Sequence, residues 1–546
     1  MSVSASTSAF TRDPSAQTTT PETRPKRSRR PSAAELINAV VDPGTFESWD
    51  STPNQPTASQ KYLRDLDAAS TKSGTDEAVV TGMGKVRGRP VALVVSEFRF
   101  LAGSIGQAAI DRVVRSIRRA TAEGLPLLAG PASGGTRMQE GTLAFLGMIA
   151  ITDAVRRHKE AGLPYLVYLR HPTTGGVMAS WGSLGHVTVA EPNALLGFLG
   201  PRVFEALYDK QFPENVQTSE NLYRKGLIDA VVPVEELPGI IDRALRILTP
   251  AEIATDSSAD SRELPGEPAN RAIADALANR AAPAKDVDTW DTWESILISR
   301  RTLRPDTRMV LASADDALPL NGTGQGEKDP GIVLALARFG AQSCVVLGQQ
   351  RPRHPDGATL GPGSLREARR GVRLAEELNL PLVTIIDTPG GELSKDAEEG
   401  GIAGEIARSL NDLIGVATAS VSVLLGQGTG GAALALLPAD RTVAAEHAWL
   451  SPLPPEGASA IIHRDLTHAA EMAEAQRVSV PWLTTFGLVD RVISEDPPAE
   501  SSPRIFCARL VTAIEEELTA ARQIPEIDRL SRRSRKFQTL GQRLNA

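Results

Sequence analysis

Two glycine-rich stretches, repeated at a constant distance along the chain, restrict the fold more than any other feature of the sequence. Three short segments recur 255 positions later in the same order, and a fourth recurs after 261 positions, which indicates a six-residue insertion. The recurring pairs are Leu125-Pro126 and Leu380-Pro381, Thr174-Gly175-Gly176 and Thr429-Gly430-Gly431, Ala190-Glu191 and Ala445-Glu446, and, at the longer distance, Gly226-Leu227-Ile228-Asp229 and Gly487-Leu488-Val489-Asp490. Such spacing predicts two homologous halves. The alternative is that unrelated α/β layers reuse glycine turns at similar spacings.

Apolar, strand-like runs alternate with helical spacings in both halves. Residues 78–81 and 91–95 predict a hairpin, and residues 104–121 predict a helix that precedes a buried strand at 125–129. The second half restarts near Trp290 with a similar order of hairpin, helix and strand. This alternation predicts an α/β fold in which much of the strand pairing is parallel.

Changes in composition place the boundaries of these halves. Residues 1–33 are rich in Ser, Thr, Pro and Ala and are expected to form a disordered tail. A stretch rich in Ser, Asp and Pro predicts an interdomain linker at 250–289. The two domains are therefore expected at 34–249 and 290–522, and a basic C-terminal tail is expected at 523–546.

Charge and cysteine content exclude several classes of function. The 546 residues carry a formal net charge of −7, which gives no overall electrostatic argument for nucleic-acid binding. Two cysteines, Cys344 and Cys507, cannot supply a four-cysteine zinc site. No apolar run is long enough to span a bilayer, and the N-terminus lacks an apolar signal core. We therefore expect a cytoplasmic enzyme with no zinc, no membrane and no nucleic-acid partner.

The sequence offers little for catalysis by side chains. It lacks a Gly-x-Ser-x-Gly elbow with suitable partners and a Walker A lysine, and its seven histidines are scattered. The main chain is the remaining candidate. Gly134-Gly135, Gly175-Gly176 and Gly430-Gly431-Ala432 lie where an apolar run ends and a small-residue run begins. Main-chain N–H groups at such junctions are unpaired and open to a ligand.

Two preorganised N–H groups can stabilise negative charge on a thioester enolate or on a ureido oxygen. Because the glycine stretches occur in both halves, we predict a pair of main-chain oxyanion holes, one from each half, that face one another across an interface. The alternative for each stretch is a tight strand-to-helix crossing that binds nothing. For Gly175-Gly176 both interpretations remain open.

Longer motifs extend these stretches. In the first half they are Phe100-Leu101-Ala102-Gly103-Ser104-Ile105-Gly106, Ser133-Gly134-Gly135-Thr136-Arg137-Met138-Gln139-Glu140-Gly141, residues 171–180, and residues 190–203. In the second half they are residues 366–371, Asp387-Thr388-Pro389-Gly390, Ala397-Glu398-Glu399, residues 428–435, and residues 451–459. The first set resembles the bacterial β subunit, and the second the α subunit, of the carboxyltransferase of acetyl-CoA carboxylase, in the biotin-dependent acyl-CoA carboxylase superfamily. The likeness covers roughly residues 34–245 and 290–495.

This resemblance implies two tandem crotonase-like (ClpP/crotonase) spiral domains built from ββα units. It also implies transfer of a carboxyl group from carboxybiotin, carried on a separate protein, to acetyl-CoA, which gives malonyl-CoA for fatty acid synthesis. By the same resemblance, Gly134 and Gly135 hold the thioester oxyanion, and Gly431 and Ala432 hold the biotin oxygen. The residues expected to bind substrate are Arg137, Gly175, Gly176, Gly430 and Leu434.

The chain also departs from the family pattern. Its cysteine content leaves no room for the zinc ribbon that is usual in the bacterial β subunit, and the β-like and α-like halves are fused. No Met-Lys-Met biotin acceptor and no ATP-binding glycine loop is found in the sequence. The resemblance therefore implies a biotin carboxylase and a biotin carboxyl carrier protein in trans, and a homo-oligomer that is a dimer or larger.

Three other functions are compatible with the same motifs. The first is a malonyl-thioester decarboxylase component, which uses related biotin chemistry in reverse. The second is a carboxyltransferase for a longer acyl-CoA. Leu434 aligns with a position that tunes acyl choice in the superfamily, and an apolar residue there is compatible with acetyl. The third is an assembly scaffold that has lost turnover.

Overall fold

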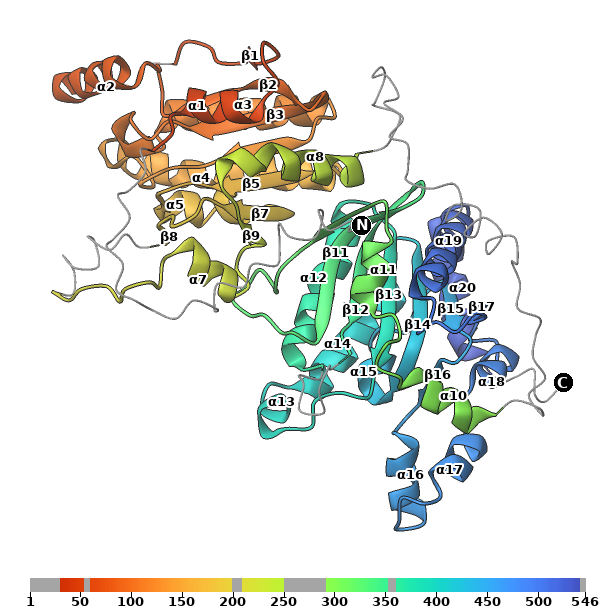
Figure 1. Cartoon of the computed structure of the whole chain (residues 1–546). Helices are drawn as coiled ribbons and strands as arrows, with labels where there is room; N and C mark the ends of the chain where they lie inside the picture. The colour runs from red at the N-terminus through yellow and green to blue at the C-terminus, as the bar shows by residue number, and fades with distance from the viewer. Residues whose placement is uncertain (1–29, 54–58, 199–208, 250–290, 352–359, 541–546) are drawn as a thin grey trace. The chain divides into compact units, whose positions relative to one another are not determined.

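The computed structural model describes residues 30–53, 59–198, 209–249, 291–351 and 360–540, which fall into two compact units. The first unit comprises Met1–Leu245 and the second Arg246–Ala546. In Figure 1 the first unit runs from red to yellow-green and the second from green to blue, and each is a sheet flanked by helices. The predicted linker at 250–289 and almost all of the predicted N-terminal tail lie outside the described residues.

In the described part of the first unit, seven strands form one sheet in the order β1-β2-β3-β4-β5-β7-β9. The pairs β1-β2 and β2-β3 are antiparallel, and every later pair is parallel. The strands are β1 (Glu47–Ser48), β2 (Val79–Val86), β3 (Arg89–Ser96), β4 (Leu127–Gly130), β5 (Tyr165–Leu169), β7 (Val187–Ala190) and β9 (Ala230–Val231). The predicted hairpin is therefore confirmed as β2-β3.

The second unit has the same strand order and the same directions. Its path is β10-β11-β12-β13-β14-β15-β17, with an antiparallel start and a parallel remainder, and β16 pairs with β14. The strands are β10 (Asp316–Pro319), β11 (Ile332–Phe339), β12 (Gln342–Gln349), β13 (Leu382–Thr388), β14 (Ser420–Thr429), β15 (Arg441–Ala445), β16 (Trp449–Ser451) and β17 (Arg491–Ile493). The predicted α/β fold with parallel pairing is confirmed in both units.

Burial explains the continuous apolar runs that mark the parallel strands. Every residue of β5 and every residue of β14 is buried, as expected for parallel strands that are covered on both faces. Helices α3 (Gln107–Ala122) and α4 (Gly141–Glu160) pack together in the first unit, as α12 (Pro362–Glu377) and α14 (Ile402–Gly415) do in the second. On α3 the apolar side chains Ile110, Val113 and Ile117 recur at helical spacing and enter the core.

The duplication extends to individual hydrogen bonds. Asp229 N donates to Thr188 O, and Thr188 N donates back to Asp229 Oδ2 over 2.8 Å. In the second unit Asp490 and Thr442 exchange the same two bonds, the second over 2.7 Å. Long-range bonds of this kind depend on the whole fold around them. The structure therefore confirms that the two halves have the same topology, as the predicted duplication requires.

The C-terminal segment differs from its prediction. Residues 523–546 were expected to form a basic, solvated tail, but Glu526–Gln538 forms helix α20, which follows α19 (Pro503–Arg522). Arg533 of α20 is 1 % exposed and donates to the carbonyl oxygens of Val416 and Thr418. The reason is that unsatisfied carbonyls at the end of α14 accept the guanidinium, which sequence composition cannot reveal.

Candidate functional site

In the second unit, the glycine stretches follow two neighbouring parallel strands. Gly390, just beyond β13, donates its N–H to Thr388 Oγ1 over 3.1 Å, and helix α15 (Gly430–Leu434) begins directly after β14. The carboxyl ends of adjacent parallel strands lie at the same edge of a sheet. The two stretches therefore come together: a Cβ placed on Gly391 would lie 3.6 Å from Ala432 Cβ.

The first unit repeats this arrangement. Gly135, just beyond β4, donates its N–H to Ser133 Oγ over 3.0 Å, and helix α5 spans Gly175–Met178. A Cβ placed on Gly175 would lie 3.1 Å from Gly135 Cα. The structure thus brings together the two glycine pairs that the sequence predicts for this half. Gly175 and Gly430 have φ values of +64° and +67°, a conformation that favours glycine.

The amides of Gly134 and Gly135 are already engaged. Gly134 N donates to Ala102 O over 2.9 Å, and Gly135 N donates to Ser133 Oγ. The expectation that these two N–H groups are unpaired is therefore wrong for this structure. The loop that follows β4 folds back on residues 102–104 and uses its own amides to do so.

Free amides instead lie at the start of the two short helices. Gly176 and Val177 are the second and third residues of α5, and Gly431 and Ala432 are the second and third residues of α15. The first amides of a helix have no acceptor within it. Among the residues that the structure describes, no acceptor outside the helices binds these four N–H groups. Each unit therefore presents two adjacent N–H donors at the same place in the fold.

Buried polar groups fix the amides of α15. Gln349, at the end of β12, donates from Nε2 to Ala432 O over 2.7 Å and accepts at Oε1 from Asp387 N over 3.2 Å. Asp387 in turn pairs with Arg351 over 2.7 Å. Burial raises the pKa of the Asp387 carboxyl above its ordinary value, although the Arg351 guanidinium opposes this shift. This chain of contacts orients the first turn of α15 rigidly.

Arg137 lies inside the first unit and does not face a ligand. Its side chain is 1 % exposed and forms a bidentate pair with Glu77. It also donates to Ser104 O over 2.8 Å and lies against the Phe100 ring. The contact with substrate that was predicted for Arg137 finds no support in this burial. Its contacts suit a residue that holds the loop after β4 in place.

The remaining predicted residues lie on or beside the short helices. Gly175, Gly176, Gly430 and Gly431 are half-buried, so their main chain can be approached. Leu434, at the end of α15, is 46 % exposed. Ala179, 255 positions earlier, is exposed as well.

The sequence analysis did not name Val177 among the residues whose N–H groups lack an acceptor. The signal was available, because the 255-residue offset that pairs Gly176 with Gly431 also pairs Val177 with Ala432. It was overlooked because a valine does not resemble the small residues of the glycine stretches. A main-chain donor depends on backbone geometry, and its side chain matters little as long as the residue is not proline.

Two absences concern the described residues alone. Within them, no group of three or more His, Cys, Asp or Glu side chains could hold a metal ion. Among the helices of the described ranges, none is both long and apolar enough to cross a membrane.

Two family descriptions match the chain. The description "Carboxyl transferase domain" matches residues 21–237, and "Acetyl co-enzyme A carboxylase carboxyltransferase-like" matches residues 271–541. Together they cover the two halves in the predicted order, β-like first and α-like second.

Curated relatives match over nearly their whole length. A probable biotin-dependent acyl-coenzyme A carboxylase beta3 subunit of Mycobacterium tuberculosis is 53% identical over 508 residues, which cover 93% of this chain and 98% of the relative. The acetyl-coenzyme A carboxylase carboxyl transferase subunits beta/alpha of Salinispora tropica are 34% identical over 523 residues, covering 93% of this chain and 90% of theirs. The first name leaves the acyl group open, whereas the second specifies acetyl.

Solved structures support the fold. Transcarboxylase 12S, described as a hexamer with methylmalonyl-coenzyme A bound, has a TM-score of 0.66 and 22% identity, covering 88% of this chain and 90% of its own. A single-chain, multi-domain long-chain acyl-CoA carboxylase has a TM-score of 0.64 and 18% identity, covering 88% of this chain and 45% of its own. At these identities the likeness shows the fold alone. The crotonase-like fold expected from the sequence is confirmed.

Proposed function

This chain belongs to the family of fused, biotin-dependent acyl-CoA carboxyltransferases, and on that premise we propose that it moves a carboxyl group from carboxybiotin, held on a separate carrier protein, to acetyl-CoA. The product of this proposed reaction is malonyl-CoA, a precursor for fatty acid synthesis. The acetyl group is the finer part of the proposal. It draws support from the relative in Salinispora tropica, whose name specifies acetyl-coenzyme A.

The observation that carries the proposal is the pair of adjacent N–H groups that each unit offers at the start of a short helix. Gly176 and Val177 form one pair, and Gly431 and Ala432 form the other. Two preorganised donors stabilise an oxygen that gains negative charge during reaction. Because these donors need no reorientation, they suit a reaction in which charge moves between two carbonyl-type oxygens.

We assign one oxyanion to each pair. Gly176 and Val177 would hold the thioester oxygen of the acyl-CoA enolate, and Gly431 and Ala432 would hold the ureido oxygen of biotin. The first assignment replaces Gly134 and Gly135, since the amides of both already donate within the protein. Gly135 keeps a supporting role in this proposal, because its Cα packs against Gly175.

No side-chain base is needed for this chemistry. When bound, carboxybiotin supplies the carboxyl group and its ureido nitrogen accepts the α-proton of the acyl group. The residues of the chain hold the two oxygens, orient the two reactants and stabilise the enolate charge. This division of roles agrees with the lack of recognisable catalytic histidine motifs in the sequence.

The experiment that tests the proposal is a transfer assay with purified partners. The chain is combined with a carboxylated biotin carboxyl carrier protein, a biotin carboxylase, ATP and bicarbonate, and the carboxylated product is measured. We expect malonyl-CoA from acetyl-CoA at a higher kcat/KM than the products from propionyl-CoA or longer acyl-CoA. No transfer to any acyl-CoA by a carrier shown to be carboxylated would contradict the proposed function.

A second candidate is carboxylation of a longer acyl-CoA. It is favoured by the relative in Mycobacterium tuberculosis, whose name specifies only acyl-coenzyme A, and by the exposed Leu434 at the end of α15. The same assay decides between the two, since the preferred acyl length is read directly from kcat/KM. Decarboxylation of malonyl-CoA without forward transfer would instead favour a decarboxylase component.

Assembly and location remain predictions that accompany the proposal. We expect a homo-oligomer, a dimer or larger, which light scattering of the purified protein will test. A strictly monomeric active species would contradict this expectation. We also expect activity in the cytoplasm, which fractionation of cells that express the chain would check.

A further inference from the structure

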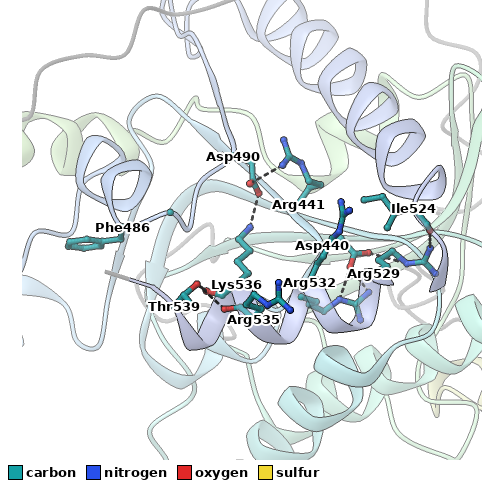
Figure 2. A pocket seen from close by; sticks show the side chains of 12 residues that line it. Asp440, Arg441, Phe486, Asp490, Ile524, Arg529, Arg532, Arg535, Lys536 and Thr539 are labelled. Carbon is teal, nitrogen blue, oxygen red and sulfur yellow. Dashed lines mark hydrogen bonds and ion pairs between the residues drawn. The ribbon is translucent and has the colours of Figure 1, made fainter. Parts of the chain in front are cut away.

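Helix α20 lines a pocket with an excess of positive charge, which we call the basic pocket. Its volume is about 350 Å³, and it is bordered by α20, the turn that follows α19, and residues near 440 and 490. Figure 2 shows several of its side chains along α20. Its cationic lining residues are Arg441, Arg529, Arg532, Arg533, Arg535 and Lys536, against which stand Asp440 and Asp490.

Both carboxylates of the basic pocket are already paired. Asp440 accepts from Arg533 over 2.9 Å. Asp490 accepts from Lys536 over 2.7 Å and from Arg441 over 3.1 Å. These pairs lie at least partly buried beneath the surface of α20. They neutralise the two carboxylates of the pocket and leave its exposed cations, Arg532 and Arg535, without a counter-charge.

Two of the cations have no side-chain partner among the described residues. Arg532 and Arg535 are exposed, and neither side chain makes a hydrogen bond or ion pair with any residue that the structure describes. They are three positions apart on one helix, so they lie on neighbouring parts of the same face and repel one another. An anion bound between the two guanidinium groups would attract both of them and offset their mutual repulsion.

A third donor is buried and unsatisfied. Arg529 is 8 % exposed, and its Nε has no hydrogen-bond acceptor among the described residues. Asp440 Oδ2 forms an ion pair with this Nε over 3.5 Å, a distance that is too long for a good N–H···O bond. A buried guanidinium N–H without an acceptor beside a pocket favours a ligand that carries acceptor oxygens.

We propose that the basic pocket binds a small molecule that carries a phosphate or diphosphate group, with Arg532 and Arg535 as its principal ligands. The planar guanidinium group matches phosphate oxygens in a bidentate manner, and five of the six cationic side chains are arginines. The volume lies at the lower end of the range for small-molecule pockets, so a confined ligand fits better than an extended acidic peptide or a nucleic acid. This site is distinct from the glycine stretches and does not depend on the proposed function.

Titration calorimetry on the full-length protein at low ionic strength tests the proposal. The probes are inorganic pyrophosphate, ADP and an acidic polyglutamate peptide. We expect saturable binding of pyrophosphate that weakens as salt is added. Equal affinity for ADP and pyrophosphate would identify the diphosphate group as the whole determinant. Tighter binding of ADP would add a nucleoside to the ligand.

Matched double variants locate the site. Arg532→Ala with Arg535→Ala should weaken pyrophosphate binding by at least about tenfold, since two charge-assisted interactions are lost. The control is Arg308→Ala with Arg504→Ala, which removes two other exposed cations of the same unit and should leave affinity nearly unchanged. Because all four side chains are exposed, thermal unfolding should be unaltered in both variants.

Three outcomes would overturn the proposal. One is the absence of pyrophosphate binding to the unaltered protein at millimolar concentration. Another is equal weakening in the pocket variant and the control, which would indicate general electrostatic attraction. The third is binding of the polyglutamate peptide without binding of pyrophosphate, which would identify an acidic partner protein as the ligand.

Discussion

The two units have the same main-chain topology but differ in the charged side chains that they bury. Ser133 and Gly135 in the first unit form the same local hydrogen bond as Thr388 and Gly390 in the second, 255 positions later. At the same offset, however, buried Arg112 on α3 is replaced by buried Glu367 on α12. The duplication therefore kept the main-chain geometry and allowed the buried side chains to diverge.

This difference bears on the proposal that one scaffold supplies two oxyanion sites. If the proposed chemistry rests on N–H groups, a duplicated chain keeps it as long as the backbone turns are kept. Side-chain charges are then free to serve stability, as Arg112 does with Asp76 and Asp50.

The largest effect is expected at Arg137, which forms a buried ion pair with Glu77 in the first unit, whereas the matched position in the second unit holds a glutamate. Replacement Arg137→Met should lower the free energy of unfolding of the first unit by about 3–5 kcal/mol, because Glu77 would remain buried without its partner. The matched position in the second unit is Glu392, which is half-buried. Chemical denaturation of both variants is the measurement. A similar loss for Glu392→Met would contradict the asymmetry.

The second prediction tests the equivalence of the free amides. Replacement Ala432→Pro or Val177→Pro removes one N–H within the first turn of a helix, where proline is tolerated. Each should reduce kcat for carboxyl transfer by about 10²–10³-fold, or about 2.7–4 kcal/mol. The measurement is the transfer assay described above.

Controls for these proline variants retain the amide. Ala432→Gly and Val177→Ala should keep kcat within a few-fold, and thermal unfolding should show that all four variants fold. A loss with Ala432→Pro alone would restrict the oxyanion role to the second unit. Full activity in both proline variants would exclude the assignment.

The third prediction concerns Glu367, the buried carboxyl group on α12 of the second unit. Burial raises the pKa of Glu367 to about 7 from its ordinary 4.5, although Arg370 opposes the shift. Between pH 4.5 and pH 7, Glu367 is therefore more protonated in the folded protein than in the unfolded chain. The contribution of Glu367 to the free energy of unfolding is then lost as pH rises from about 4.5 to about 7. Glu367→Gln should remove this loss, which amounts to about 3 kcal/mol above pH 7.

The check on Glu367 is chemical denaturation as a function of pH. The difference in unfolding free energy between Glu367→Gln and the unaltered protein should grow from pH 4.5 to pH 7 and then level off. Replacement of exposed Glu474 by Gln serves as the control, with no such trend expected. A pH-independent difference would show that folding does not raise the pKa of Glu367.

The smallest effect distinguishes Gly175 from Gly430, the positive-φ glycines that begin the two short helices. Either alanine replacement forces an L-residue into a left-handed conformation, which costs about 1–2 kcal/mol. The loss in unfolding free energy should be larger for Gly175→Ala, whose Cβ would lie 3.1 Å from the main chain at Gly135, than for Gly430→Ala, where the nearest atom is Pro452 O at 3.5 Å. Thermal unfolding of both variants is the measurement, and the reverse order would contradict the tighter packing in the first unit.

Much of the architecture was predictable from the sequence. The constant offset between Thr174-Gly175-Gly176 and Thr429-Gly430-Gly431 predicted two related halves, and the apolar runs predicted parallel strands, because local patterning determines which faces are buried. The glycine stretches were also predicted to lie at the ends of strands, since glycine marks close approach of the main chain; that they bind substrate stays a prediction.

The sequence could not decide which amides are free. The sequence motif around Gly134 and Gly135 is typical of oxyanion donors. In the structure, however, their N–H groups donate to Ala102 O and Ser133 Oγ. Ala102 lies some thirty residues earlier, and only the folded chain brings it to the loop. Val177 is the opposite case, because its apolar side chain gives no hint of a role, yet its N–H has no acceptor outside the helix among the described residues.

The amino-acid sequence was enough to predict the duplicated α/β scaffold and its family, because hydrophobic periodicity and glycine turns act over short distances. Tertiary structure alone decided the partners of charges and main-chain donors, such as Arg137 with Glu77 and Arg533 with the carbonyls at the end of α14. The physical reason is that a polar group taken out of water must find its partner in space, whatever the separation along the chain.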